Sequence, residues 1–403
     1  MRMFYFVTDS YPAWRVDVSE LFGRELKALG VDTTWSMRRD DAGSFSCVSY
    51  EGQDAYVPFA AKGGQVFEAL SRRLGEFVSE FLLFAKLLSG ARYDVIQVRD
   101  DRYSAGLFAL MAARLRGSKF VYWVSFPFPE NDLEKAAQAS GVRRAVLRLR
   151  GTLTSWWLYR FMLRQADHVF VQSDRMKQDI AGYGVPPEKM TPVPMGVPPR
   201  LFDWVSGSRH EVQAETVAYT GTFARSRKLE TLIEAFVLVL KDFPAARLYM
   251  VGRGDVPEDR VYLEKLCMQL GVADSVIFPG FLPIEEAWSV AASSAVCISP
   301  MYSCLVLDCA SPTKLFEYMA MGRPVVANEQ PEQTAVLGES GAGLCVSWST
   351  ENFAKAICQL LADPDKAHAM GQMGPIWVAK HRRYDGLAAQ VFQQYRIMLG
   401  DQA

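Results

Sequence analysis

The sequence is poor in histidine, almost neutral and without a long apolar run. Four histidines and seven cysteines with no paired spacing predict neither a metal cluster nor a disulfide framework, so we expect a reducing compartment and no metal. The net charge is −1, without the basic excess of nucleic-acid-binding proteins, so no nucleic-acid partner is expected.

The apolar cluster 81–85 ends at Lys86, whereas a membrane-spanning helix needs about 20 apolar residues. Residues 1–7 are too short for a signal-peptide core. We therefore expect a cytoplasmic protein.

The length of 403 residues, half of them hydrophobic, exceeds the usual size of a single core and predicts two domains. Short apolar runs alternate with helical patterns along the whole chain, which is typical of βαβ units with parallel sheets. Such sheets carry their ligand sites at the carboxyl ends of the strands. The predicted strands are 4–7, 32–35, 94–98, 120–124, 168–171, 216–220, 247–251, 276–278, 295–299 and 324–327.

A cluster of prolines interrupts the periodicity at 192–200 and predicts the linker between the domains. We therefore place an N-terminal domain at 1–198, a C-terminal domain at 199–383 and a final helix within 384–403. Lys and Arg outnumber Asp and Glu in residues 1–200, and the reverse holds in the remainder. A basic N-terminal domain fits an anionic acceptor or a membrane surface.

Residues 311–327 predict a helix whose N-terminus can bind an anion. Ser311 is a good N-cap, and Pro312 suits the first helical position. The amides of Thr313 and Lys314 would then be free at the positive end of the helix dipole, where a diphosphate is stabilised. Any α/β protein contains capped helices before valine-rich strands, so this pattern alone also fits a purely structural role.

The same helix has a core face and a polar face. Leu315 and Met319 are one turn apart and are expected in the core, whereas Glu317 projects from the other side, toward a cleft. Gly322 ends the helix, and the valine-rich residues that follow predict a buried strand.

A basic turn follows the predicted strand 216–220. Gly221 lets the backbone approach a ligand, and Thr222 follows it in the same turn. Of the three cations that follow, we expect Arg225 and Lys228 to neutralise a diphosphate and to stabilise a departing anion. The alternative is a solvated basic turn.

Residues 311–327 resemble the signature of retaining glycosyltransferases of family 4 (glycosyl transferases group 1). These enzymes have the GT-B fold, an α/β architecture of two doubly wound Rossmann-like domains facing across a cleft. The resemblance implies that Glu317 binds the ribose hydroxyls of a nucleotide-sugar donor and that Arg225 and Lys228 grip its phosphates. It is specific over 216–345 and looser before 165, and it implies that the final helix crosses back to the N-terminal domain.

Two further loops acquire a role through this resemblance. Gly252 and Arg253 form a strand-to-turn pattern that lacks the third glycine of a dinucleotide fingerprint, and the resemblance puts them beside the nucleobase. Phe281 and Leu282 resemble the loop that flanks the base. Phe281 would either stack there or belong to the core.

The sequence departs from the family pattern on the catalytic side. Cys309 stands where many members have the first of two glutamates, and Asp308 replaces it if the loop is shifted by one residue. Ser125 stands where a histidine near the reacting sugar is common, and a hydroxyl cannot replace imidazole as acid or base. Gly196 belongs to the hinge pattern and would let backbone approach the cleft floor. Ser125 and Gly196 are the predicted acceptor-side residues.

Arginines and indoles alternate in residues 141–164, the composition of an interfacial helix. One interpretation is peripheral membrane contact, at the inner face of the membrane, with a lipid-linked acceptor; residues 67–88 would then extend the same surface. The other is a surface helix with one buried face and arginines lying along it. The single Asp-x-Asp pair, Asp363 and Asp365, indicates a helix start rather than a metal site.

These observations lead us to expect a metal-independent glycosyltransferase that moves a sugar from a UDP-sugar or GDP-sugar to a glycan or lipid-linked acceptor, with retention of configuration. No cofactor is expected. One alternative is a nucleotide-sugar-binding assembly partner without catalysis, which the changes at Ser125 and Cys309 favour. Another is a nucleotide-sugar epimerase or hydrolase of the same fold, although no convincing acid and base pair is found for it.

Overall fold

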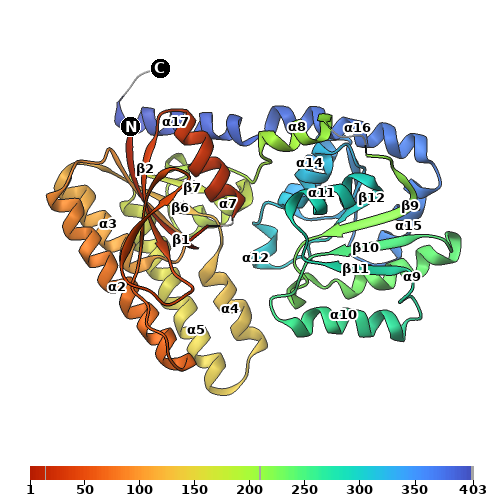
Figure 1. The fold of residues 1–403 in the computed structure, drawn as a ribbon, viewed down its shortest axis with the longest axis horizontal. Coiled ribbons are helices and arrows are strands. Elements are labelled where there is room, and N and C mark those ends of the chain that lie inside the picture. The colour runs from red at the N-terminus through yellow and green to blue at the C-terminus, as the bar shows by residue number, and fades with distance from the viewer. Residues whose placement is uncertain (14, 208–209, 401–403) are drawn as a thin grey trace. The chain divides into compact units, whose positions relative to one another are not determined.

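The computed structural model describes residues 1–13, 15–207 and 210–400, without the side chains of residues 65 and 66. The chain divides into two compact units (Figure 1). The first comprises Met1–Pro194 and Tyr384–Ala403, and the second comprises Met195–Arg383. The sequence placed these boundaries at 198/199 and 383/384.

The first unit contains a sheet with the strand order β3-β4-β2-β1-β5-β6-β7-β8. All neighbouring strands are parallel except β3 and β4, which form an antiparallel hairpin. The strands are β1 (Arg2–Ser10), β2 (Asp32–Arg38), β3 (Ser46–Tyr50), β4 (Gln53–Val57), β5 (Val95–Arg99), β6 (Lys119–Val124), β7 (His168–Val171) and β8 (Met190–Pro192).

Helices cover the sheet of the first unit. The final helix belongs to this unit: Tyr384 and Val391 are fully buried in the same hydrophobic core as Trp35, and the Tyr395 hydroxyl donates to Gln97 Oε1 at 2.6 Å. The helices are η1 (Asp17–Glu25), α1 (Leu26–Ala28), α2 (Gln65–Ser89), α3 (Tyr103–Arg116), α4 (Phe128–Gln138), α5 (Gly141–Ser155), η2 (Trp156–Met162), α6 (Leu163–Gln165), α7 (Asp174–Gly182), η3 (Pro187–Lys189) and α17 (Tyr384–Leu399).

The second unit has a parallel sheet with the order β11-β10-β9-β12-β13-β14, whose chain order reverses at β9 as in a doubly wound fold. Its strands are β9 (Gln213–Thr220), β10 (Arg247–Val251), β11 (Val276–Gly280), β12 (Ser294–Ser299), β13 (Val325–Asn328) and β14 (Gly343–Val346). Its helices are α8 (Pro199–Gly207), η4 (Arg225–Arg227), α9 (Glu230–Asp242), α10 (Pro257–Gln269), α11 (Ile284–Ser293), α12 (Leu305–Asp308), α13 (Thr313–Ala320), α14 (Pro331–Ser340), α15 (Thr350–Leu361) and α16 (Pro364–His381).

Each predicted strand is present, and the two sheets confirm the predicted α/β class. The sequence missed β3, β4, β8 and β14 because these strands are short or rich in polar residues. The β3–β4 turn depends on Glu51 and Gly52, which both have positive φ. The predicted linker 192–200 is partly regular, since β8 ends at Pro192 and α8 begins at Pro199. No helix in the described ranges is both long and apolar enough to cross a bilayer.

Candidate functional site

The loops after β9, β10 and β11 are joined through their backbones. Gly221 N donates to Val251 O at 2.9 Å, and Gly252 N donates to Gly280 O at 2.9 Å. A Cβ atom at Gly252, where φ is +144°, would overlap the carbonyl oxygen of Gly221. The two glycines therefore let neighbouring loops approach closely at the carboxyl end of the sheet, where doubly wound domains bind ligands.

Helix α13 begins at Thr313, with Pro312 in the N-cap position. The prediction that Ser311 caps this helix is wrong: its buried hydroxyl accepts a hydrogen bond from Met195 N at 2.9 Å, a tertiary contact that the local sequence does not reveal. The first amides of α13, at Thr313 and Lys314, still lack intrahelical acceptors and lie at the positive end of the helix.

Lys314 brings a positive charge to the glycine loop. Its Cε lies 3.1 Å from where a Cβ of Gly221 would be, and its Nζ is 5.6 Å from the centre of the Tyr219 ring. Burial, together with the positive charge of Arg227, lowers the pKa of Lys314 to about 7. The Tyr318 hydroxyl accepts from Thr220 N at 2.7 Å and thereby fixes α13 against the end of β9.

Glu317 lies on the partly exposed face of α13, whereas Leu315 and Met319 are fully buried. This distribution confirms the two faces that the sequence predicts for the helix. Trp288 Nε1 donates to Glu317 Oε1 at 3.4 Å. Burial raises the pKa of Glu317 to about 7, against the opposing effects of Trp288 and Lys314.

The structure separates the three cations of the basic turn. Arg225 lies 3.4 Å above the Tyr262 ring, and its Nε is 3.4 Å from Asp259 Oδ1. Lys228 has a left-handed backbone, with φ of 52°, and its Nζ is 3.8 Å from a Glu230 carboxylate oxygen.

Arg227 is the cation of this turn that acts on Lys314. Its Nη1 contacts Met301 Sδ at 2.9 Å, and its charge contributes to the lowered pKa of Lys314. Spacing alone does not show which of the three cations of a 3₁₀ turn lies near Lys314, so the sequence offered no reason to single out Arg227.

Phe281 is 69% exposed, and the Arg253 guanidinium lies 4.8 Å from the centre of its ring. The alternative that Phe281 belongs to the core is therefore wrong. Thr222 is also exposed, and Leu282 is half-buried. These side chains belong to the loops that follow β9, β10 and β11, so an aromatic face, a guanidinium and a hydroxyl lie at the carboxyl end of this sheet.

Asp308, rather than Cys309, presents an acidic group. Ser303 donates to Asp308 Oδ2 at 3.0 Å, while Oδ1 is buried with no hydrogen-bond partner in the described chain. Cys309 is 2% exposed, and its thiol donates to Val306 O at 3.3 Å. Gln330 holds this loop through a hydrogen bond to Ala310 O at 2.9 Å.

In the first unit, Ser125 belongs to a buried ionic cluster. Its hydroxyl donates to Asp100 Oδ2 at 2.6 Å and accepts from Arg99 Nη2 at 2.8 Å. Arg99 also binds Asp17 at 2.7 Å. The Ser125 hydroxyl is thus fully engaged. The other predicted acceptor-side residue, Gly196, is buried in the second unit.

Of this cluster the sequence pointed only to Ser125, so Asp9, Asp17, Arg99 and Asp100 were all missed. Asp9 has an unsatisfied carboxylate oxygen. Its Oδ2 lies 3.8 Å from Arg99 Nη1, and neither atom has a hydrogen-bond partner within the described residues. Burial raises the pKa of Asp9. A hydroxyl beside these two atoms would satisfy both, by donating to the carboxylate and accepting from the guanidinium. The sequence feature that could have identified Asp9 is its position at the carboxyl end of the first strand.

Across residues 1–13, 15–207 and 210–400, no group of three or more His, Cys, Asp or Glu side chains is arranged to hold a metal ion. Asp363 Oδ1 accepts from Lys366 N at 3.1 Å and caps α16. The interpretation of the Asp-x-Asp pair as a helix start is therefore confirmed.

Two family models match the chain in succession. Residues 18–196 match the glycosyl transferase 4-like domain, and residues 214–363 match glycosyl transferases group 1. A GDP-mannose-dependent alpha-(1-6)-phosphatidylinositol monomannoside mannosyltransferase of Mycobacterium tuberculosis is 26% identical over 290 residues, which cover 67% of this chain and 74% of that protein.

Solved structures of the same fold cover nearly the whole chain. Sucrose-phosphate synthase of Thermosynechococcus elongatus has a TM-score of 0.72 at 19% identity, covering 100% of both chains. HepE of Anabaena, in complex with UDP, has a TM-score of 0.68 at 13% identity, covering 98% of this chain and 99% of that one. The chain belongs to the group 1 glycosyltransferases, family 4, and has the GT-B fold.

Proposed function

We propose that this glycosyltransferase uses a nucleoside diphosphate sugar as donor and transfers the sugar with retention of configuration and without a metal. The observation that carries the proposal is the convergence of Lys314, the N-terminus of α13 and the backbone of Gly221 at the end of β9. Amides and an ammonium group together form a site for a diphosphate, whose charge would otherwise call for a metal.

The surrounding residues have distinct roles in this proposal. Glu317 accepts hydrogen bonds from the ribose hydroxyls, and Phe281 with Arg253 flanks the base. Arg225 and Lys228 stabilise the negative charge that grows on the leaving diphosphate. The departing phosphate takes the proton of the acceptor hydroxyl, so the reaction requires no separate general base from the chain.

The acceptor is proposed to be a glycan or a lipid-linked glycan. The mycobacterial relative is named for a phosphatidylinositol monomannoside acceptor and for GDP-mannose, which supports this class and a GDP-sugar. A UDP-sugar is the alternative donor. Asp9 and Arg99 offer an unpaired acceptor and donor for one acceptor hydroxyl.

Calorimetric titration with UDP, GDP, ADP and their common sugar conjugates, with and without magnesium, tests the donor site. We expect micromolar binding of one base that is unchanged by magnesium. If no nucleotide binds, the proposed donor site is wrong. If a nucleotide sugar binds but no acceptor glycan or glycolipid is modified, the result favours the second candidate, a non-catalytic assembly partner, which the burial of Ser125 and Cys309 supports.

A further inference from the structure

Helix α5 and the first residue of η2 form a continuous exposed apolar stripe, the α5 stripe. Val142, Val146, Leu149, Leu153 and Trp156 follow one another at helical spacing and are 81%, 57%, 62%, 58% and 59% exposed. The opposite face packs on α4, where a Cβ at Gly151 would lie 2.9 Å from Leu133 Cγ. Packing on α4 therefore explains the apolar residues on only one face of this helix. If α5 were an ordinary surface helix, its exposed apolar stripe would have no explanation.

The segment that carries the stripe has only positively charged side chains. Residues 141–162 contain no Asp or Glu. Arg150 is paired with Asp132 of α4, whereas the remaining arginines of the segment are exposed. These are Arg143, Arg144, Arg148 and Arg160. An apolar stripe flanked by unpaired arginines is the pattern that binds an anionic lipid surface.

A second exposed stripe runs along α2. Its members are 51% to 65% exposed and also have helical spacing, and they are Phe67, Leu70, Leu74, Phe77 and Phe81. Helix α2 packs on α3 through Phe108, whose ring centre is 5.4 Å from that of Phe84 and 5.8 Å from that of Phe77. Helix α3 therefore lies against α2 on one side and contacts η2 on another.

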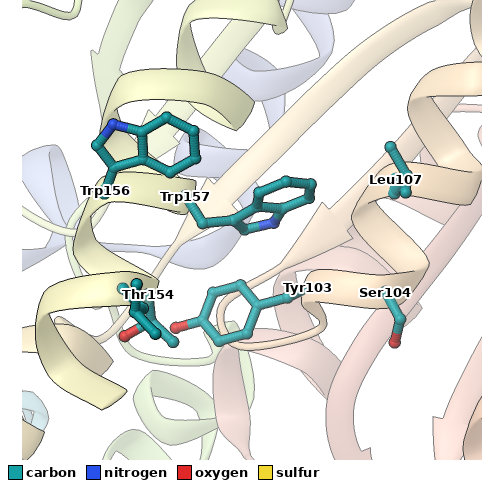
Figure 2. A pocket seen from close by; sticks show the side chains of 7 residues that line it. Tyr103, Ser104, Leu107, Thr154, Trp156 and Trp157 are labelled. Carbon is teal, nitrogen blue, oxygen red and sulfur yellow. The ribbon is translucent and has the colours of Figure 1, made fainter. Parts of the chain in front are cut away.

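A pocket of about 390 Å³ lies between α3 and the α5–η2 segment. Figure 2 shows the indoles of Trp156 and Trp157 and the ring of Tyr103 around it, with Leu107 across from them. The indole N–H of Trp157 has no hydrogen-bond partner within the described residues. The lining is thus apolar and aromatic, with one unsatisfied donor. The residues are Tyr103, Ser104, Leu107, Leu153, Thr154, Trp156 and Trp157.

We propose that the stripes of α2 and α5 bind an anionic lipid bilayer and that the pocket takes one hydrocarbon chain of a lipid. The stripes supply apolar contact, and the arginines of α5 attract anionic headgroups. The pocket encloses one hydrocarbon chain of a lipid that otherwise remains in the bilayer. An ester or phosphate oxygen of the same lipid accepts from Trp157 Nε1.

The pocket also lies close in the chain to the ionic cluster of the first unit. Tyr103 opens α3 three residues after Asp100, whose carboxylate binds Ser125. A lipid-linked acceptor with its chain in the pocket would place its polar head toward the carboxyl end of β5. This step rests on the proposed function, whereas bilayer binding does not.

Co-sedimentation with vesicles tests the bilayer surface. We expect binding to vesicles of phosphatidylcholine with phosphatidylglycerol, weaker binding to phosphatidylcholine alone, and loss of binding as salt rises. The double variant V146E/L149E should lower the partition coefficient at least about tenfold. The matched control is M373E/I376E on α16, where the side chains are 50% and 72% exposed. Equal binding by both double variants would overturn the proposal, and so would self-association of the chain that V146E/L149E abolishes in the absence of lipid.

Tryptophan quenching by lipids with brominated chains tests the pocket. The fluorescence that Trp157→Phe removes should be quenched in bound protein, and Leu153→Phe, which narrows the pocket without adding an indole, should reduce that quenching while vesicles still bind. A Trp157 signal unaffected by bromine would show that no chain enters. Nucleotide titration of V146E/L149E separates the two proposals, because the donor site should bind as in the wild type even if bilayer binding is lost.

Discussion

Gly221 and Gly252 lie so close together that a Cβ atom on Gly252 would overlap the Gly221 carbonyl oxygen. Gly252 also has φ of +144°, a conformation that other residues rarely adopt. The contact holds the loops after β9 and β10 in register with each other, and Lys314 packs against the first of them. The geometry of the proposed diphosphate site therefore requires glycine, which has no side chain, at both positions.

Gly252→Ala should destabilise the protein by about 2–4 kcal/mol, because the new methyl group meets backbone atoms and the φ angle is unfavourable. Nucleotide binding should be lost with it. Denaturant unfolding and calorimetry measure the two effects. The control is Gly338→Ala in α14, where a Cβ meets nothing within 4 Å; it should leave nucleotide affinity unchanged and raise the free energy of unfolding by about 0.5–1 kcal/mol, because alanine is the better helix former. Normal nucleotide affinity in Gly252→Ala would contradict the role of this contact.

Glu317 should make the ligand-free protein less stable as pH rises. Its pKa is raised from 4.5 to about 7 in the folded state, so between these values the unfolded state binds fewer protons and stability falls with increasing pH. Glu317→Gln should therefore raise the melting temperature relative to wild type at pH 8 but not at pH 4.5, while weakening nucleotide binding. Thermal melts across pH test this, and a difference that does not vary with pH would count against it.

Nucleotide affinity should fall as pH rises through about 7, the pKa to which burial lowers Lys314, because the neutral amine no longer attracts the diphosphate. Lys314→Met should bind weakly and lose this pH dependence. Arg227→Ala should shift the fall to higher pH, since a nearby positive charge is removed. Calorimetric titrations from pH 6 to 9 provide the comparison. An unshifted profile in Arg227→Ala would show that this cation does not act on Lys314.

Arg225 and Lys228 should affect catalysis more than binding. Both are about half exposed in the ligand-free protein, and the charge on the leaving diphosphate grows in the transition state. Arg225→Ala and Lys228→Ala should each lower kcat by more than they raise the donor Kd. Steady-state kinetics together with titration separate the two quantities. If kcat is unchanged and only Kd rises, these residues bind the donor without stabilising the departing group.

The sequence was sufficient for the strands with continuous apolar runs and for the two faces of α13, because both depend on local periodicity. The sequence was insufficient where the role of a side chain depends on a residue far away in the chain. Ser311 is a suitable N-cap in isolation, but the amide of Met195 takes its hydroxyl. The apolar residues of the α5 stripe would have the same sequence spacing whether they were buried or exposed. Only the packing of Gly151 on α4 shows which face of the helix is exposed to solvent.

Asp308 is expected to contact the transferred sugar, because its Oδ1 is buried without a partner while Ser303 holds the other oxygen. Asp308→Asn should lower kcat by about 10²-fold, since one carboxylate lone pair becomes a donor, and should leave the affinity for the free nucleoside diphosphate unchanged. Cys309→Ala is the matched control. Its thiol is 2% exposed, so the variant should lose stability but retain kcat. Transfer assays with the donor identified by titration compare the two variants. A large loss of kcat in Cys309→Ala, together with full activity in Asp308→Asn, would show that residue 309, and not Asp308, occupies the position of the family's first glutamate. The carboxylate oxygen of Asp308 that has no hydrogen-bond partner would then have no catalytic role.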